Sequence, residues 1–195
     1  MTYKKIAVVG IPGKWSTEAL ADALEEKTDF RLVVDMADVT ADLTTGTLTA
    51  KGVDLTNLDG LVVKKITEVY SPNSLDRLEL LRLAEAAGVR VFSPAVNMLR
   101  LIDRLACTVT LRNGGIPMPE TQVTENVDVA VKAVKTFGAA VFKPLYSTKA
   151  RGMTVIDSTQ PDAEILDAIT AFKAENPMMY IQRKLSLPGQ DLGLV

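Results

Sequence analysis

The first half of the chain alternates continuous apolar runs with stretches of helical periodicity. Four runs are typical of strands buried on both faces of a parallel sheet, at residues 5–9, 31–34, 60–63 and 89–92. Helices are expected after an N-cap at Ser16 or Thr17 and across 71–87, and a short hairpin is expected across 39–49. This alternation predicts a Rossmann-like parallel sheet with helices on its faces, closed by Pro94.

The second half has a different order of elements. Helical periodicity and glycine stops predict helices at 95–113, 127–137 and 163–174. Strands are expected at 121–124, 140–142, 153–156 and 178–182, and Leu192 begins another. In the helix across 95–113, Leu99, Ile102, Leu105 and Val109 form the expected core face. The chain is therefore expected to be α/β with two domains, at 1–94 and 95–195.

The segment that joins two strands of the second half carries the candidate chemistry. The apolar run 140–142 delivers Lys143 at the end of its strand, where Pro144 removes a ladder donor. A small, polar and basic loop follows at 147–152. Backbone N–H groups and cations at such a strand turn form a nest for phosphate oxygens, so this hairpin is expected to cover an anion.

Composition narrows the classes of function. Among 195 residues, 47% are hydrophobic, which indicates a globular chain, and the net charge of −2 gives no basic field for nucleic acid. The chain has no histidine, which excludes His-ligated metals and serine or cysteine triads. The one cysteine, Cys107, has apolar neighbours and is expected to be a buried structural thiol. No apolar run could span a bilayer, so we expect a cytoplasmic protein without a membrane partner.

Two loops of the first half are candidate substrate contacts. The segment 10–14, GIPGK, is similar to a P-loop but lacks its glycine spacing and has Trp15 in place of the hydroxyl residue, so a tight βα turn is favoured. It also lacks the glycine pattern of NAD(P) proteins. Lys64 and Lys65 stand directly at the end of the expected strand 60–63. Both loops follow strand ends, where open α/β sheets bind ligands. A substrate role for Lys14, Trp15 and Ser16 is the minority interpretation of the first loop, whereas solvated positions and a ligand site explain Lys64 and Lys65 equally well.

The second half resembles the ATP-grasp superfamily. The resemblance rests on VFKPLYSTKARGM at 141–153, GGIPMPET at 114–121, MYIQRKL at 179–185 and GQDL at 189–192, in that order. The branch that it is most similar to contains the RimK-type ligases and glutathione synthetases, including the GAK-system ATP-grasp proteins. This resemblance implies a Rossmann-like domain followed by the first α+β subdomain of an ATP-grasp fold.

The resemblance also implies a set of functional residues. Nucleotide contacts are expected at Arg104, Lys143, Ser147, Thr148, Lys149, Arg151, Gly152, Gln182, Arg183, Lys184, Leu185 and Asp191. Lys143 and Arg104 would bind the α- and β-phosphates, the loop 147–152 would close over the β- and γ-phosphates, and 182–185 would hold adenine. Lys65 matches a basic residue that faces the active site. The chain departs from the family at Ser147 and Ala150, where glycines are common, at Arg183, where Glu is usual, and at Gly193, where Arg is usual.

The implied activity is ATP-dependent carboxylate–amine ligation through an acyl phosphate. ATP and Mg²⁺ would be the cofactors, and small carboxylates and amines such as amino acids or peptides the substrates. The family's Mg²⁺ ligands come from a later segment, so we expect a fragment of a longer enzyme, inactive alone, or a natural short form. An exposed strand edge at Val195 would suit a homo-oligomer. The alternative function is a non-catalytic nucleotide-binding or scaffold module.

Overall fold

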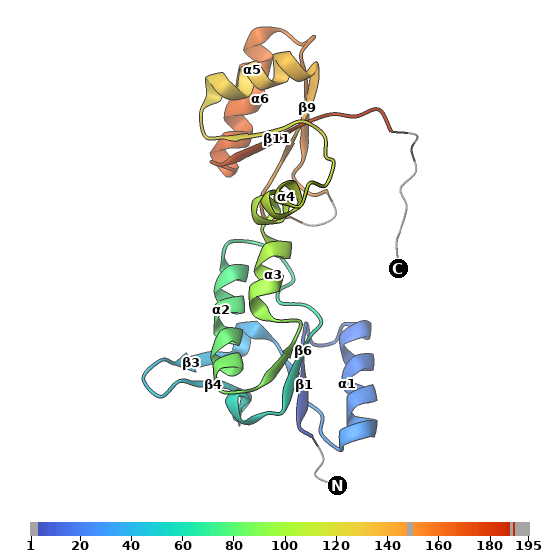
Figure 1. The fold of residues 1–195 in the computed structure, drawn as a ribbon, viewed down its shortest axis with the longest axis vertical. Coiled ribbons are helices and arrows are strands. Elements are labelled where there is room, and N and C mark those ends of the chain that lie inside the picture. The colour runs from blue at the N-terminus through green and yellow to red at the C-terminus, as the bar shows by residue number, and fades with distance from the viewer. Residues whose placement is uncertain (1–3, 148–149, 188, 190–195) are drawn as a thin grey trace. The chain divides into compact units, whose positions relative to one another are not determined.

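The computed structural model describes residues 4–147, 150–187 and 189, and the chain divides after Ala106 into two compact units (Figure 1). The first unit includes the helix α3 (Ala95–Ile102), because α3 packs against α2 (Asn73–Ala86). The domain boundary at residue 94 stays a prediction. The expected α/β class, with a Rossmann-like part followed by an α+β part, is confirmed.

The first unit is built on a four-stranded sheet in which every neighbouring pair is parallel. Its strands, in spatial order, are β2 (Val33–Val34), β1 (Ile6–Val9), β6 (Gly60–Val63) and β7 (Arg90–Phe92). The helix α1 (Trp15–Thr28) lies on one face, and α2 and α3 lie on the other (Figure 1). Continuous apolar runs form these strands because helices cover both faces of the sheet.

The segment of sequence between β2 and β6 forms a second, smaller sheet. It contains β3 (Thr40–Asp42), β4 (Thr47–Ala50) and β5 (Val53–Asp54), flanked by the 3₁₀ helices η1 (Met36–Asp38) and η2 (Leu55–Asn57). The expected hairpin across 39–49 is therefore confirmed. Its turn is held by Asp42, whose carboxylate accepts the Thr44 N–H at 2.8 Å. The main-chain N–H groups of Thr44 and Thr45, which both donate to this carboxylate, hold the pKa of Asp42 below its usual value.

The start of α1 differs from the expected N-cap at Ser16 or Thr17. The helix begins at Trp15, and Thr17 is 2% exposed, packed beneath the loop instead of capping the helix. Lys14 is the N-cap residue without a side-chain capping bond, and the Glu18 carboxylate instead holds the preceding loop, since its Oε1 accepts the Gly13 N–H at 2.6 Å. The same carboxylate accepts from the Arg31 guanidinium at 2.7 Å. The backbone donor first, and then Arg31, lower the pKa of Glu18.

Glu18 should therefore contribute stability that depends on pH. A carboxyl whose pKa is lower in the folded chain stabilises it above the unfolded value of 4.5, and this contribution is lost as pH falls through the lower, folded value. We expect Glu18→Gln to reduce the free energy of unfolding at pH 7, and the difference from the unaltered chain to shrink at acid pH. Urea titrations across pH measure this difference, with Glu26→Gln on the same helix as control. A deficit that grows below pH 4 would contradict the assignment.

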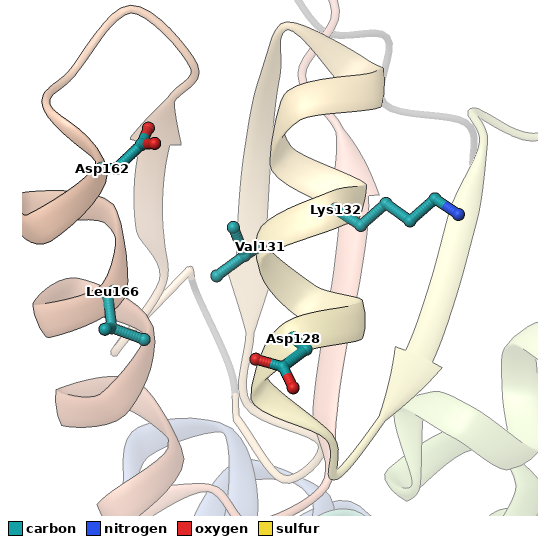
Figure 2. Close-up of a pocket in the computed structure, with 5 residues that line it drawn as sticks. All are labelled: Asp128, Val131, Lys132, Asp162 and Leu166. Atoms are coloured by element: carbon teal, nitrogen blue, oxygen red, sulfur yellow. The ribbon is translucent and has the colours of Figure 1, made fainter.

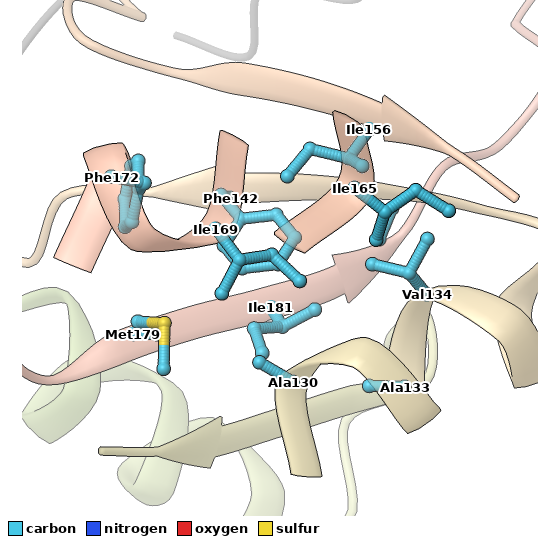
Figure 3. Close-up of a cluster of buried hydrophobic side chains, with 11 residues drawn as sticks. Ala130, Ala133, Val134, Phe142, Ile156, Ile165, Ile169, Phe172, Met179 and Ile181 are labelled. Atoms are coloured by element: carbon cyan, nitrogen blue, oxygen red, sulfur yellow. The ribbon is translucent and has the colours of Figure 1, made fainter. Parts of the chain in front are cut away.

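The second unit has an antiparallel sheet covered on one face by two helices (Figure 1). Its strands, in spatial order, are β10 (Thr154–Asp157), β9 (Ala139–Lys143), β11 (Met179–Arg183) and β8 (Thr121–Thr124). The covering helices are α5 (Val127–Phe137) and α6 (Asp162–Glu175). Figure 3 shows the core between helices and sheet, formed by Ala130, Ala133, Val134, Ala140, Phe142, Ile156, Ile165, Ile169, Phe172, Met179 and Ile181.

The single helix expected across 95–113 is wrong, because two helices occupy this segment. α3 ends at Ile102, Asp103 is extended, and α4 (Arg104–Asn113) begins at the next residue. The Asp103 carboxylate accepts the Leu105 N–H at 2.8 Å, which makes it a local helix-start signal. Val109, expected in the core, is 48% exposed, and Cys107 is partly exposed instead of buried. Among the described helices, none has the length and apolar character needed to cross a membrane.

Candidate functional site

The candidate site lies on the face of the second sheet opposite α5 and α6. Side chains alternate across a strand, so the burial of Phe142 against the helices directs Lys143 to the other face. On β11, Ile181 packs against the same helices, and Gln182 turns away from them. The register pairs β9 with β11 directly, and so the two polar side chains meet on this face although 39 residues separate them.

A chain of hydrogen bonds orients these side chains. Lys143 Nζ donates to Gln182 Oε1 at 2.6 Å, and Gln182 Nε2 donates to Thr121 Oγ1 at 2.9 Å. Thr121 Oγ1 in turn donates to the Pro119 carbonyl at 2.8 Å. The amide oxygen of Gln182 is neutral, so it positions the Lys143 ammonium without cancelling its charge. The arrangement therefore holds a fixed positive charge at the end of β9, which suits an anionic group.

Tyr180, which was not expected from the sequence, lies on the same face, and Thr108 of α4 contacts it. Tyr180 lies opposite Lys143 in the strand pairing and is only 4% exposed. Its hydroxyl lies 3.0 Å from Thr108 Oγ1 on α4 and 3.5 Å from Gln182 Nε2. The hydroxyl groups of Tyr180 and Thr108 therefore extend the hydrogen-bond network around the Gln182 amide. Tyr180 could have been identified from its position opposite Lys143 on the neighbouring strand. That position is known only once the register between β9 and β11 is known.

The loop after β9 has the backbone that the family's glycines would allow. Ala150 has φ +57° and Gly152 has φ +69°, both in the left-handed region. A Cβ at Gly152 would lie 3.1 Å from Pro144 Cγ, so a side chain there would be both strained and crowded. Ser147 is half-buried and Arg151 is exposed. The predicted contacts Thr148 and Lys149 lie outside the described residues.

The predicted adenine linker at 182–185 divides between the two faces. The Arg183 side chain lies toward the helices, with its guanidinium 5.6 Å from the Phe137 ring and Nε 2.6 Å from Glu120 Oε2. This ion pair is not an aligned hydrogen bond. The main-chain N–H of Arg183 donates to the Glu120 carbonyl, and that of Lys184 donates to the Ala139 carbonyl. Any main-chain donor to a ligand must therefore come from Leu185 or beyond, and Asp191 lies outside the described residues.

Two predicted residues belong to the first unit. Arg104 is the first residue of α4 and is partly exposed, so its phosphate contact stays a prediction. Lys65 is exposed in the loop after β6, and the Lys64 and Lys65 N–H groups donate to the Val9 carbonyl at 2.8 and 3.2 Å. Neighbouring Gly10 packs closely against Thr17, where a Cβ would come within 2.7 Å of its methyl group. These contacts place Lys65 beside the loop that follows β1.

A pocket was not expected from the sequence, and it lies on the helix side of the second unit. It has a volume of about 400 Å³. Figure 2 shows its lining residues on α5 and α6, which are Asp128, Val131, Lys132, Asp162 and Leu166. Lys143 and Gln182 lie on the opposite face of the sheet, so the pocket and the candidate site are separate. Lys135 borders this side with an ion pair to Asp162 at 2.6 Å.

Known proteins are similar in sequence to most of this chain. No protein-family model matches the chain. The tetrahydromethanopterin:alpha-L-glutamate ligase of Methanosarcina acetivorans is 28% identical over 204 residues, which cover 97% of this chain and 63% of the relative. The chain thus spans less than two thirds of that relative's length.

Solved structures show the same fold. A RimK domain ATP-grasp protein from Sphaerobacter thermophilus matches 95% of this chain and 66% of its own, with a TM-score of 0.71 and 17% identity. The ATP-grasp ligase PsnB, solved with a variant of its minimal precursor, Mg and ADP, matches 95% of this chain and 66% of its own, with a TM-score of 0.65 and 16% identity. The chain therefore has the fold of RimK-domain and other ATP-grasp ligases, and its sequence is similar to that of a glutamate ligase.

Proposed function

We propose that this chain is the ATP-binding part of a RimK-like carboxylate–amine ligase. The observation that carries the proposal is the Lys143 ammonium, held by Gln182 on the face opposite the helices. A following loop with two left-handed residues, Ala150 and Gly152, supports it, because such a backbone directs N–H groups toward a common anion. The second sheet with this hairpin matches the fold of ligases, one of which was solved with ADP.

The residues would act mainly by positioning and charge neutralisation. Lys143 would bind phosphate oxygens of ATP, Arg104 is proposed as a further phosphate contact, and the loop 147–152 would cover the transferred phosphoryl group. A carboxylate would attack the γ-phosphorus and form an acyl phosphate, with ADP leaving. An amine would then attack the acyl carbon and form an amide, with phosphate leaving. Leu185 would supply the main-chain donor for adenine.

The described residues do not form a ligand cluster for the implied Mg²⁺ by themselves. Across residues 4–147, 150–187 and 189, no group of three or more Asp, Glu, His or Cys side chains is placed to hold a metal ion. Mg²⁺ takes oxygen ligands, and phosphate oxygens of the nucleotide supply part of such a set in kinases and related enzymes. No step is therefore assigned to the metal, and its protein ligands stay unassigned.

The name of the curated relative suggests a general class of substrate for this chain. That protein is called a ligase of tetrahydromethanopterin and alpha-L-glutamate, which names an amino acid as one substrate. We propose an amino acid or peptide amine and a small carboxylate acceptor for this chain, with Lys65 facing the acceptor. A cytoplasmic location stays a prediction.

The second candidate function is a nucleotide-binding module without turnover, favoured by the lack of a metal cluster among the described residues. Phosphate release from ATP distinguishes the two. It is measured with L-glutamate and a carboxylate acceptor together and with each alone, on this chain and on the longest natural form of the protein. A ligase releases phosphate, together with amide formation, only when both the acceptor and L-glutamate are present. Nucleotide binding without release by the longest form would favour the module.

A further inference from the structure

Two neighbouring loops of the first unit expose large apolar side chains at one edge of the parallel sheet. Trp15, at the start of α1, is 85% exposed, and it is the only tryptophan of the chain. Val69, in the loop after β6, is 66% exposed. Both follow the carboxyl ends of strands, β1 and β6. Open α/β sheets bind ligands at this edge, and exposed apolar side chains that lie together there supply a surface for an apolar group of a ligand.

Specific contacts bring the two loops together. Val9 and Val63, the last residues of β1 and β6, are paired in the sheet register. Lys14 Nζ, one residue before Trp15, forms an ion pair with Glu68 Oε1 at 3.2 Å, one residue before Val69. The Lys64 and Lys65 N–H groups donate to the Val9 carbonyl. The indole, the valine and the two lysines therefore share one edge.

The charges at this edge favour an anion. Lys14 is paired with Glu68, but among the residues that the structure describes, no carboxylate lies within ion-pair distance of Lys64 or Lys65. Both lysines are exposed. Two adjacent cations next to an exposed indole suit a molecule that has both a planar ring and a carboxylate. The ring would stack on the indole, and the carboxylate would be held by the lysines.

We infer that this edge binds the acceptor through a planar aromatic ring on Trp15 and a carboxylate on Lys64 and Lys65. The inference rests on the proposed ligase function, because it identifies the class of the acceptor as an aromatic carboxylate. An aliphatic amino acid would fill only the lysine part of the surface. A neutral aromatic compound would fill only the indole part.

Fluorescence of the single tryptophan, excited at wavelengths that tyrosine does not absorb, tests the inference directly, because this signal comes from Trp15 alone. The chain is titrated with p-aminobenzoyl-L-glutamate, which has a ring and two carboxylates. L-glutamate lacks the ring, and p-aminobenzamide lacks the carboxylates. We expect saturable quenching by the first compound. Calorimetry compares the affinities of the three compounds. We expect L-glutamate to bind about two- to twelvefold more weakly than p-aminobenzoyl-L-glutamate, which is the range of an aromatic pair. Equal affinities, or no saturable quenching by p-aminobenzoyl-L-glutamate, would overturn the inference.

A lysine pair at the other edge of the sheet supplies the matched control. The double variant Lys64→Gln and Lys65→Gln should bind p-aminobenzoyl-L-glutamate about two- to thirtyfold more weakly. Lys4→Gln and Lys5→Gln, which remove the same charge before β1, should not change binding. Equal losses in both pairs would indicate a general charge effect and reject the site. The comparison of compounds on the unaltered chain decides the question even if a variant does not fold.

The test separates this inference from the proposed function. Mg-ADP binding is measured on the same samples, and the proposed nucleotide site belongs to the second unit. Normal Mg-ADP binding without an effect of p-aminobenzoyl-L-glutamate on Trp15 would reject only the acceptor class. Loss of Mg-ADP binding by the unaltered chain would count against the ligase function, whatever the tryptophan signal.

Discussion

Replacement of Lys143 by alanine should weaken Mg-ADP binding by about 10- to 150-fold, the range of a hydrogen bond to a charged group. The ammonium is held by Gln182 at 2.6 Å on the face opposite the helices, so its orientation does not have to be restricted on binding. Alanine removes the positive charge and leaves the Gln182 oxygen without this donor. Isothermal titration calorimetry of the two proteins measures the difference.

A lysine on the other face of the same unit is the matched control. Lys132 is exposed on α5 and lines the pocket between the two helices (Figure 2). Lys132→Ala removes the same charge from the same unit, and binding should stay within about twofold, as expected for an exposed charge at a distance. A loss with Lys132→Ala and none with Lys143→Ala would place the nucleotide between α5 and α6 instead.

Replacement of Phe142 by alanine should destabilise the second unit by about 3–5 kcal/mol, the usual cost of removing a buried phenylalanine. Phe142 is fully buried between the sheet and the helices (Figure 3). Its ring meets Phe172 edge to face, with centroids 5.4 Å apart. The cavity that remains would be lined by isoleucines and Met179, which are held by the sheet and α6 and cannot fully close it.

Amide hydrogen exchange of β9 and β11 reads the stability of this unit. Val155→Ala on the adjacent strand β10 is the control, because Val155 is 51% exposed and should cost less than about 1 kcal/mol. The tryptophan signal reports on the first unit and should be little changed by either variant. Equal effects of the two substitutions on β9 exchange would show that Phe142 does not anchor the core.

The strands and most helices could be predicted because their periodicity is local. The parallel sheet of the first unit follows from runs such as Ala7–Val9, which only a sheet covered on both faces can bury. The break at Asp103 was missed because apolar periodicity continues through Ile102 into Leu105, and a single carboxylate outweighs it. The start of α1 was misplaced because its N-cap is Lys14, whose side chain makes no capping hydrogen bond and so gives no local sequence signal.

The candidate site was only partly predictable for a different reason. Lys143 and Gln182 were each predicted from the family resemblance, but their contact depends on the register between β9 and β11, which no local pattern determines. Tyr180 and Thr121 were missed because such residues are common in any strand. Arg183 was predicted beside Gln182, yet strand alternation directs its side chain to the opposite face, toward Glu120.

The most direct test of the central claim is to locate the nucleotide by NMR. Amide shifts of the isotope-labelled chain are followed while Mg-ADP is added to saturation. Binding on the face opposite the helices predicts the largest changes at Lys143, Gly152 and Gln182, with little change at Lys132 and Leu166. Largest changes at Lys132 and Leu166, or no change at any concentration, would contradict a nucleotide site at Lys143.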